Sequence, residues 1–249
     1  YVLRKLRLIK KLGLPPLRVI WWRTLKRLGR IPRSDEGYTI DAEQAVEICQ
    51  KNGTLMDIAM FSHRWLRGDE NPAHPDSADG SKATACTVYA NYWDGVWTNY
   101  GSDLEIFFWI DFASVDQDNP IPGILSLPCH IAACHDIVCY DTPEYHDRAW
   151  CRLERLIAYQ MHYRVEQLFL PPEVTQESFG ERKERTLLLN PMDGNLTNEN
   201  DRKFIQHLMD LMMKHQVATS PDTIKEFGTA MCKDDPVQFG ASTVYTVFH

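Results

Sequence analysis

The stretch EIFFWID, residues 105–111, decides the fold, because five consecutive apolar residues end at a carboxylate. Two other stretches have the same form, LMDIAMF at residues 55–61 and DIVCY at residues 136–140. Each is short, apolar and followed by polar or turn-forming residues, which is typical of strands buried within a parallel sheet. The three stretches therefore predict three parallel strands.

Helical patterns lie between these strands, at about residues 81–100 and 123–135. This alternation predicts an α/β domain whose parallel sheet is covered by helices on both faces. Ligands bind such sheets at the carboxyl ends of the strands. Polar residues follow all three predicted strands, at 62–65, 111–117 and 141–145. We expect these clusters to gather at one rim, beside a helix over residues 148–163.

The predicted 148–163 helix carries a carboxylate in apolar surroundings. Trp150 and Glu154 are four residues apart, so they share one helical face, on which the other neighbours are also apolar. An acid in an apolar stripe is unfavourable unless a partner or a function uses it. Two interpretations stay open: a structural ion pair, for example with Arg148 or Arg155, or a functional group at the rim.

Three motifs carry a family resemblance over residues 55–170. Residues 150–154 read Trp-Cys-Arg-Leu-Glu, residues 109–111 read Trp-Ile-Asp, and residues 60–65 end in Ser-His-Arg-Trp. They resemble the Trp-Cys-x-x-Glu helix motif, the Phe-Ile-Asp strand end and the Phe-x-Ser-Phe-Arg-Gly strand end of Toll/interleukin-1 receptor (TIR) domains. The resemblance implies an α/β, flavodoxin-like fold with a parallel sheet of five strands and helices on both faces.

In the enzymatic members of this family, the glutamate of the motif is the catalytic residue of NAD hydrolysis. The resemblance therefore implies an NAD glycohydrolase with Glu154 as catalytic carboxylate, NAD as substrate and no bound cofactor. It points to these NAD-binding residues: Ser62, Arg64, Trp65, Asp111 and Trp150. Cleavage of the nicotinamide–ribose bond has an oxocarbenium-like transition state. Because nicotinamide leaves as a neutral molecule, a single preorganised carboxylate can supply much of the stabilisation.

Structural roles compete with these assignments. Arg64 either holds the diphosphate through paired hydrogen bonds or pairs with a nearby acid such as Asp69. Trp65 and Trp109 either stack on a base or belong to the core, and Asp111 either contacts a ribose hydroxyl or caps the next turn. The residues alone leave these alternatives open.

The sequence departs from the family pattern near the expected site. Phe112 takes the position of a second acid, the following loop reads QDNPIPG at residues 117–123 without an Arg-Gly pair, and Trp65 replaces a glycine. These departures keep two other functions in view. One is a non-catalytic TIR-like scaffold or interaction subunit of a larger assembly. The other is a nucleoside-processing transferase of related fold, which would also use a glutamate at the rim.

Other site chemistries have less support. Cys129, Cys134 and Cys139 recur every five residues. That step turns about 140° around a helix, so the thiols diverge and we expect no metal site. No glycine-rich phosphate loop follows any predicted strand, which argues against a nucleoside triphosphate enzyme.

Charge is distributed unevenly along the 249 residues. Residues 1–34 contain 11 basic residues and no acid, whereas the rest of the chain holds 16 basic and 34 acidic residues, a net charge of −18. Interspersed apolar residues make this basic arm amphipathic. We expect it to dock on the chain's own acidic body or on a protein partner within an oligomeric assembly. A membrane surface is an alternative partner, and a nucleic acid is the least favoured.

The predicted organisation has three parts: a docking arm over residues 1–34, a TIR-like α/β domain over residues 35–215, and a C-terminal extension over residues 216–249. Within the domain we expect a fourth strand over residues 165–170. A last helix over residues 198–215, capped by Thr197, should pack against the sheet.

In the C-terminal extension, Ser220-Pro221 predicts a helix start, and residues 242–249 predict an edge strand or a docked tail. Seven cysteines without a secretory framework, and no apolar run near the ~18–20 residues of a membrane span, predict an intracellular protein. The compartment is not indicated.

Overall fold

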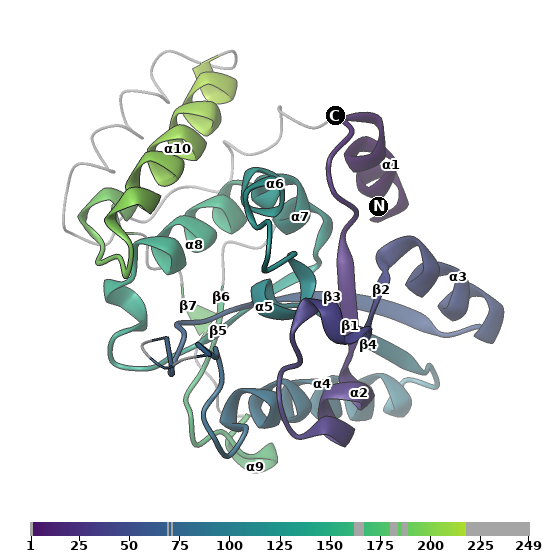
Figure 1. The fold of residues 1–249 in the computed structure, drawn as a ribbon. Coiled ribbons are helices and arrows are strands. Elements are labelled where there is room, and N and C mark those ends of the chain that lie inside the picture. The colour runs from purple at the N-terminus through teal and green to yellow at the C-terminus, as the bar shows by residue number, and fades with distance from the viewer. Residues whose placement is uncertain are drawn as a thin grey trace.

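A seven-stranded mixed sheet forms the centre of the computed structural model, which describes residues 2–68, 70, 72–161, 167–179, 184–185 and 189–217. The strands are β1 (Arg18–Trp21), β2 (Thr39–Asp41), β3 (Leu55–Ser62), β4 (Leu104–Trp109), β5 (Asp136–Tyr140), β6 (Gln167–Leu170) and β7 (Glu184–Arg185). Their order across the sheet is β2-β1-β4-β3-β5-β6-β7 (Figure 1).

The four central strands run parallel. β3 pairs with β4 on one side and with β5 on the other, and β5 pairs with β6. In chain order these four strands are arranged 2-1-3-4, which is the flavodoxin-like arrangement. The predicted α/β class and the three predicted strands are therefore confirmed. The described residues contain no fifth parallel strand; β1, β2 and β7 extend the sheet antiparallel at its two edges.

Helices cover both faces of the sheet (Figure 1). They are α1 (Val2–Lys11), α2 (Trp22–Leu28), α3 (Ala42–Asn52), α4 (Ser81–Asn99), α5 (Asp111–Ser114), α6 (Ile121–Leu125), α7 (Leu127–Ala133), α8 (Ala149–Met161), α9 (Gln176–Phe179) and α10 (Arg202–Val217). Short 3₁₀ turns add η1 (Ser34–Glu36), η2 (Tyr145–Asp147), η3 (Pro191–Asp193) and η4 (Glu199–Asp201). In the described part of the chain, every helix is too short or too polar to cross a membrane.

The faces of the sheet carry two separate apolar cores. Helices α1, α3, α7 and α8 bury residues such as Leu6, Ile131 and Leu153 on one face. Helices α2, α4 and α9 bury residues such as Leu25 and Tyr89 on the other. The single helix expected over residues 123–135 is replaced by α6 and α7. Each of them has a proline near its start, at Pro122 and Pro128, where the missing N–H is tolerated.

The basic N-terminal segment belongs to this sheet. β1 lies antiparallel to β4 in the register Ile20↔Phe108, and Val19, Ile20 and Leu25 are fully buried. α1 packs against α3 and α7, with Arg4, Arg7, Lys10 and Lys11 exposed and Lys5 buried. The sheet thus begins at residue 18, before the predicted boundary at residue 34, and the segment docks on its own chain.

The C-terminal helix differs from its prediction in two respects. α10 packs mainly against α8, η3 and η4, whereas the sequence placed it on the sheet, and it buries Ile205 and Leu208. Asn198, not Thr197, caps the preceding turn, because its side chain accepts a hydrogen bond from the backbone N–H of Asn200. The predicted strand over 165–170 is observed as β6. The helix expected at Ser220-Pro221 and the segment 242–249 lie outside the described residues.

A close approach at Gly80 joins the N-terminal segment to α4. Gly80 has φ +71°, and a Cβ there would overlap the carbonyl oxygen of Gly29, at the end of α2. We predict that Gly80→Ala lowers the free energy of unfolding by about 3 kcal/mol. Gly53→Ala is the control, since Gly53 has φ +69° and open space around it, and should lose only about 1 kcal/mol. Equal losses in urea denaturation would contradict this prediction.

Candidate functional site

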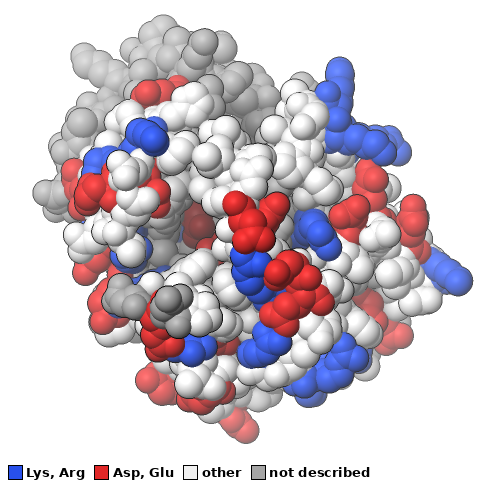
Figure 2. Space-filling view, in the orientation of Figure 1, with Lys and Arg blue, Asp and Glu red and all other residues white. Residues whose placement is uncertain are grey.

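A pocket of about 360 Å³ opens beside the carboxyl ends of β3 and β4 and the start of α8. Figure 2 shows this face hollowed between α8 and α5, with acidic residues inside the hollow. The predicted residues that line it are Glu154, Arg64, Trp65, Asp111 and Trp150. The sixth, Ser62, lies behind the pocket and is fully buried. The structure thus brings the predicted residues together at the expected end of the parallel strands.

The carboxyl of Glu154 is enclosed by protein but retains access to the pocket. Ser62 Oγ donates a hydrogen bond of 2.6 Å to Glu154 Oε2, and a 2.7 Å hydrogen bond joins Ser62 Oγ to the hydroxyl of Tyr145. Burial raises the pKa of Glu154 to about 8, and the nearby charge of Asp111 adds to the rise, whereas the Ser62 hydrogen bond opposes it. In the unliganded protein at neutral pH, Glu154 is therefore mostly protonated.

The expected structural partners of Glu154 point elsewhere. Arg148 donates to Thr197 Oγ1 at 2.7 Å, and Arg155 contacts His146 Nδ1 at 3.0 Å. No basic side chain forms an ion pair with Glu154 within the ranges given above for the structure. An acid lying in a pocket without such a pair is the arrangement expected of a functional group rather than of a structural one.

Two tryptophans in the pocket wall are each held by a carboxylate. Trp65 Nε1 donates to Asp111 Oδ2 at 2.8 Å, and Trp150 Nε1 donates to Asp201 Oδ2 at 3.1 Å. All four side chains line the pocket. Trp109 also lines it but is only 2% exposed, so this residue is mainly core. The other oxygen of Asp111 accepts the backbone N–H of Phe112 at 2.6 Å in the first turn of α5, while Ile110 occupies the N-cap position.

Arg64 is paired at the mouth of the pocket. Its Nη1 lies 3.0 Å from Glu144 Oε2, and the Glu144 side chain is 58% exposed. Such an exposed pair contributes little to stability. Arg64 can therefore exchange Glu144 for an anionic ligand at a small energetic cost. Asp69, the acid suggested by the sequence, lies outside the described residues.

Several residues of the site could not be recognised from the sequence. His63 is buried between β3 and Asp111, and burial lowers its pKa to about 4, with the charge of Lys82 adding to the effect. Asp201 reaches the pocket from η4, about fifty residues beyond Trp150. Tyr145 lies in η2, five residues before Trp150, and its place in the polar cluster after the third predicted strand was the one available signal.

The loop that departs from the family pattern forms one wall. Gln117 Nε2 donates to the carbonyls of Asp111 and Val115, at 3.0 and 2.9 Å. Gly123 packs on Val115, where a Cβ would overlap the valine side chain. The amide of Gln117 thus fixes the backbone of this loop.

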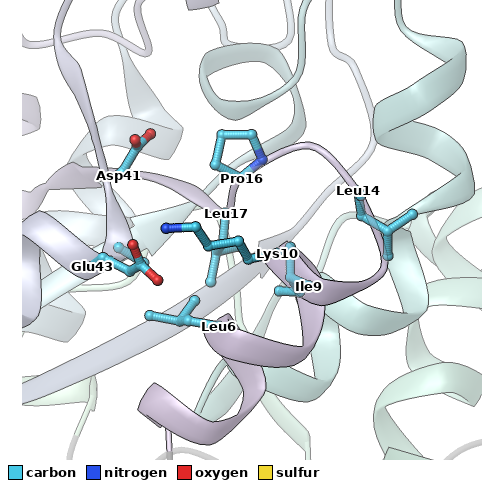
Figure 3. Close-up of a pocket in the computed structure, with 10 residues that line it drawn as sticks. Leu6, Ile9, Lys10, Leu14, Pro16, Leu17, Asp41 and Glu43 are labelled. Atoms are coloured by element: carbon cyan, nitrogen blue, oxygen red, sulfur yellow. The ribbon is translucent and has the colours of Figure 1, made fainter.

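A second pocket, of about 310 Å³, lies between α1 and the start of α3. Its floor is made by apolar residues such as Leu6, Ile9 and Leu17, and Lys10 extends toward the side where Asp41 and Glu43 lie (Figure 3). It contains neither a tryptophan nor a buried acid. No group of histidine, cysteine or acidic side chains suited to a metal ion occurs in the described ranges. The reactive groups therefore gather in the Glu154 pocket.

Comparison with known proteins gave no match to any protein-family model, and no significantly similar curated protein or solved structure. The functional conclusion therefore depends on the fold and on the chemistry of this pocket.

The raised pKa of Glu154 predicts a characteristic pH dependence of stability. Between pH ~4.5 and ~8 the folded protein keeps this proton while the unfolded chain releases it, so stability falls as pH rises through this window. Glu154→Gln removes the effect. We expect this variant to be more stable than the wild type at pH 8 by about 2 kcal/mol, less than the full shift implies because water reaches the pocket. Near pH 4.5 the two should be equally stable.

Chemical denaturation at pH 4.5 and pH 8 measures this difference. Glu47→Gln, on the exposed face of α3, is the matched control and should show no such pH-dependent gain. A Glu154→Gln variant that gains nothing on going from pH 4.5 to pH 8 would show that Glu154 ionises normally in the folded protein.

Proposed function

We propose that this protein is an NAD glycohydrolase of the TIR type, which cleaves the nicotinamide–ribose bond. The observation that carries the proposal is the position of Glu154. Its carboxyl faces a pocket at the carboxyl ends of parallel strands, is held by Ser62, and forms no ion pair with Arg148 or Arg155. The Trp-Cys-x-x-Glu resemblance supplies the reaction.

The reaction requires few groups. The electron pair of the C1′–N bond leaves with nicotinamide, which departs neutral because its ring nitrogen was positively charged. The ribose is left as an oxocarbenium ion, and water adds to C1′ and loses a proton, which yields ADP-ribose. The Glu154 carboxylate would lie beside the developing positive charge, where a fixed negative group is most effective. The hydrogen bonds among Tyr145, Ser62 and Glu154 fix its orientation.

The remaining residues fit binding and orientation. The pocket volume of about 360 Å³ lies near the lower end of the usual ~300–1,000 Å³ range for ligand sites. It suits the nicotinamide riboside half of NAD, with the rest of the ligand outside. Arg64, at the mouth, would bind the diphosphate in place of Glu144. Asp111 would accept a ribose hydroxyl, and Trp65 and Trp150 would pack against the nicotinamide ring.

Nicotinamide release from NAD tests the proposal directly. The wild type should release nicotinamide, and Glu154→Gln should reduce kcat on the order of 10²–10³-fold or more, because it removes the charge and preserves the shape. Glu47→Gln should retain full activity. The assay should include concentrated protein, since TIR enzymes act as assemblies and this chain would then be an oligomer.

Two negative outcomes have different meanings. If the wild type releases no nicotinamide, even when concentrated or bound to a partner, the protein is better explained as a non-catalytic scaffold. The observation that favours a scaffold is Trp65, which stands where the family has a glycine. Turnover of deoxynucleosides without turnover of NAD would indicate the nucleoside-processing transferase.

The pH profile of kcat/KM provides a second test. The active form of Glu154 is the carboxylate, and its pKa in the free protein is about 8. We therefore expect kcat/KM to rise with pH, by up to tenfold per unit, and to level off above about pH 8. A profile that is flat or falls between pH 6 and pH 8 would show that the carboxylate is not the form required.

A further inference from the structure

The pocket has a repeated feature that hydrolysis alone does not require. Two indole rings, Trp65 and Trp150, line it, and each donates its N–H to a carboxylate that also lines it, Asp111 and Asp201. Hydrogen bonding to a carboxylate draws negative charge toward the ring system. The negative faces of indole rings attract cations. Each pair thus places an indole ring and a carboxylate together in the pocket lining.

Four of the ionisable groups around Glu154 are neutral. Tyr145, Cys139 and Cys151 all have a pKa raised chiefly by burial, that of Cys139 to about 12. His63 is also uncharged, since its pKa is lowered to about 4. The charge that acts on Glu154 from a neighbouring element is that of Asp111, on α5. Nothing among these groups compensates a negative Glu154 in the unliganded pocket.

The two arginines that line the pocket are each bound to another side chain. Arg64 pairs with Glu144, and Arg148 donates to Thr197. The lining therefore carries two cations and three acids, namely Asp111, Asp201 and Glu154. A lining of both signs suits a ligand that is itself cationic at one end and anionic at the other.

We propose that this pocket is a binding site for a flat aromatic cation, and that the positive charge of the ring is the feature that the pocket recognises. On binding, the carboxylic acid of Glu154 releases its proton to solvent, and the resulting carboxylate and the ring cation form a pair. The identification of this ring with the nicotinamide end of NAD depends on the proposed function, whereas the binding itself does not require cleavage.

This coupling gives selectivity for charge over shape. A neutral ring of the same size leaves Glu154 protonated and gains no electrostatic attraction. A cationic ring stabilises the carboxylate, and the same ring becomes a neutral leaving group once the bond breaks. The pocket would accordingly bind N-alkylated pyridinium compounds and oxidised, but not reduced, nicotinamide nucleotides.

Two probes of nearly equal shape test the proposal: 1-methylnicotinamide, which is a cation, and nicotinamide, which is neutral. Isothermal titration calorimetry at pH 7, in buffers of different ionisation enthalpy, gives both the affinity and the number of protons released. We expect the wild type to bind the cation at least 10-fold more tightly and to release close to one proton per ligand. At pH 9.5 the release should fall toward zero, because Glu154 is then already ionised.

Three variants make the test specific. Glu154→Gln should bind the cation more weakly and release no proton at either pH, whereas Glu47→Gln should behave as the wild type. Asp201→Asn should weaken binding of the cation several-fold and still release the proton, since Glu154 is intact. Circular dichroism spectra identical to the wild type show that each variant is folded.

Equal affinities for the two probes, or binding of the cation without proton release at pH 7, would overturn the proposal. These outcomes are distinct from failure of the proposed function. A protein that binds the cation with proton release but leaves NAD intact supports the inference and refutes hydrolysis. A protein that cleaves NAD but binds the two probes equally supports hydrolysis and refutes the inference.

Discussion

The hydrogen bond between Ser62 and Glu154 connects the last residue of the central strand β3 to helix α8, and the pocket depends on it. A buried carboxyl is unfavourable unless its hydrogen-bonding capacity is used. Ser62 is fully buried and is itself bonded to Tyr145, so its hydroxyl has little freedom to move. The acid is consequently fixed in orientation without forming an ion pair, and this combination makes it available to a ligand.

The opposite wall of the pocket is held from beneath by the start of α4. Lys82 is fully buried, and its ammonium donates to the carbonyl oxygens of Arg64 and Pro75, the two ends of the segment that carries Trp65. The carboxylate of Asp76 accepts the N–H groups of Lys82 and Ala83 and so caps the helix. The segment that presents Arg64 and Trp65 is thus attached to the scaffold at both ends.

The sequence was sufficient to predict the central strands and the position of Glu154 at their carboxyl ends, because both are local signals: short apolar runs, and an acid four residues from a tryptophan. It was insufficient for β1, in which the four residues Arg18–Trp21 are embedded in a basic amphipathic segment. Asp201 and the α10 contact with α8 also escaped prediction, since they depend on where distant segments pack. Edge strands and long-range contacts are decided by tertiary packing, which overrides local preference.

The geometry around Arg155 bears on whether Glu154 is structural or functional. Arg155 is the next residue in the chain and is only 1% exposed, so a buried cation is present on the same helix turn. Its guanidinium lies 5.1 Å from the centre of the Phe169 ring and contacts His146, on the side away from the pocket. If Glu154 had a structural role, the simplest arrangement would be an ion pair between Glu154 and Arg155, because a buried charge is costly without a partner. The helix instead directs the two side chains apart. Glu154 is therefore left as the group of the pocket that can gain or lose a proton when a ligand binds.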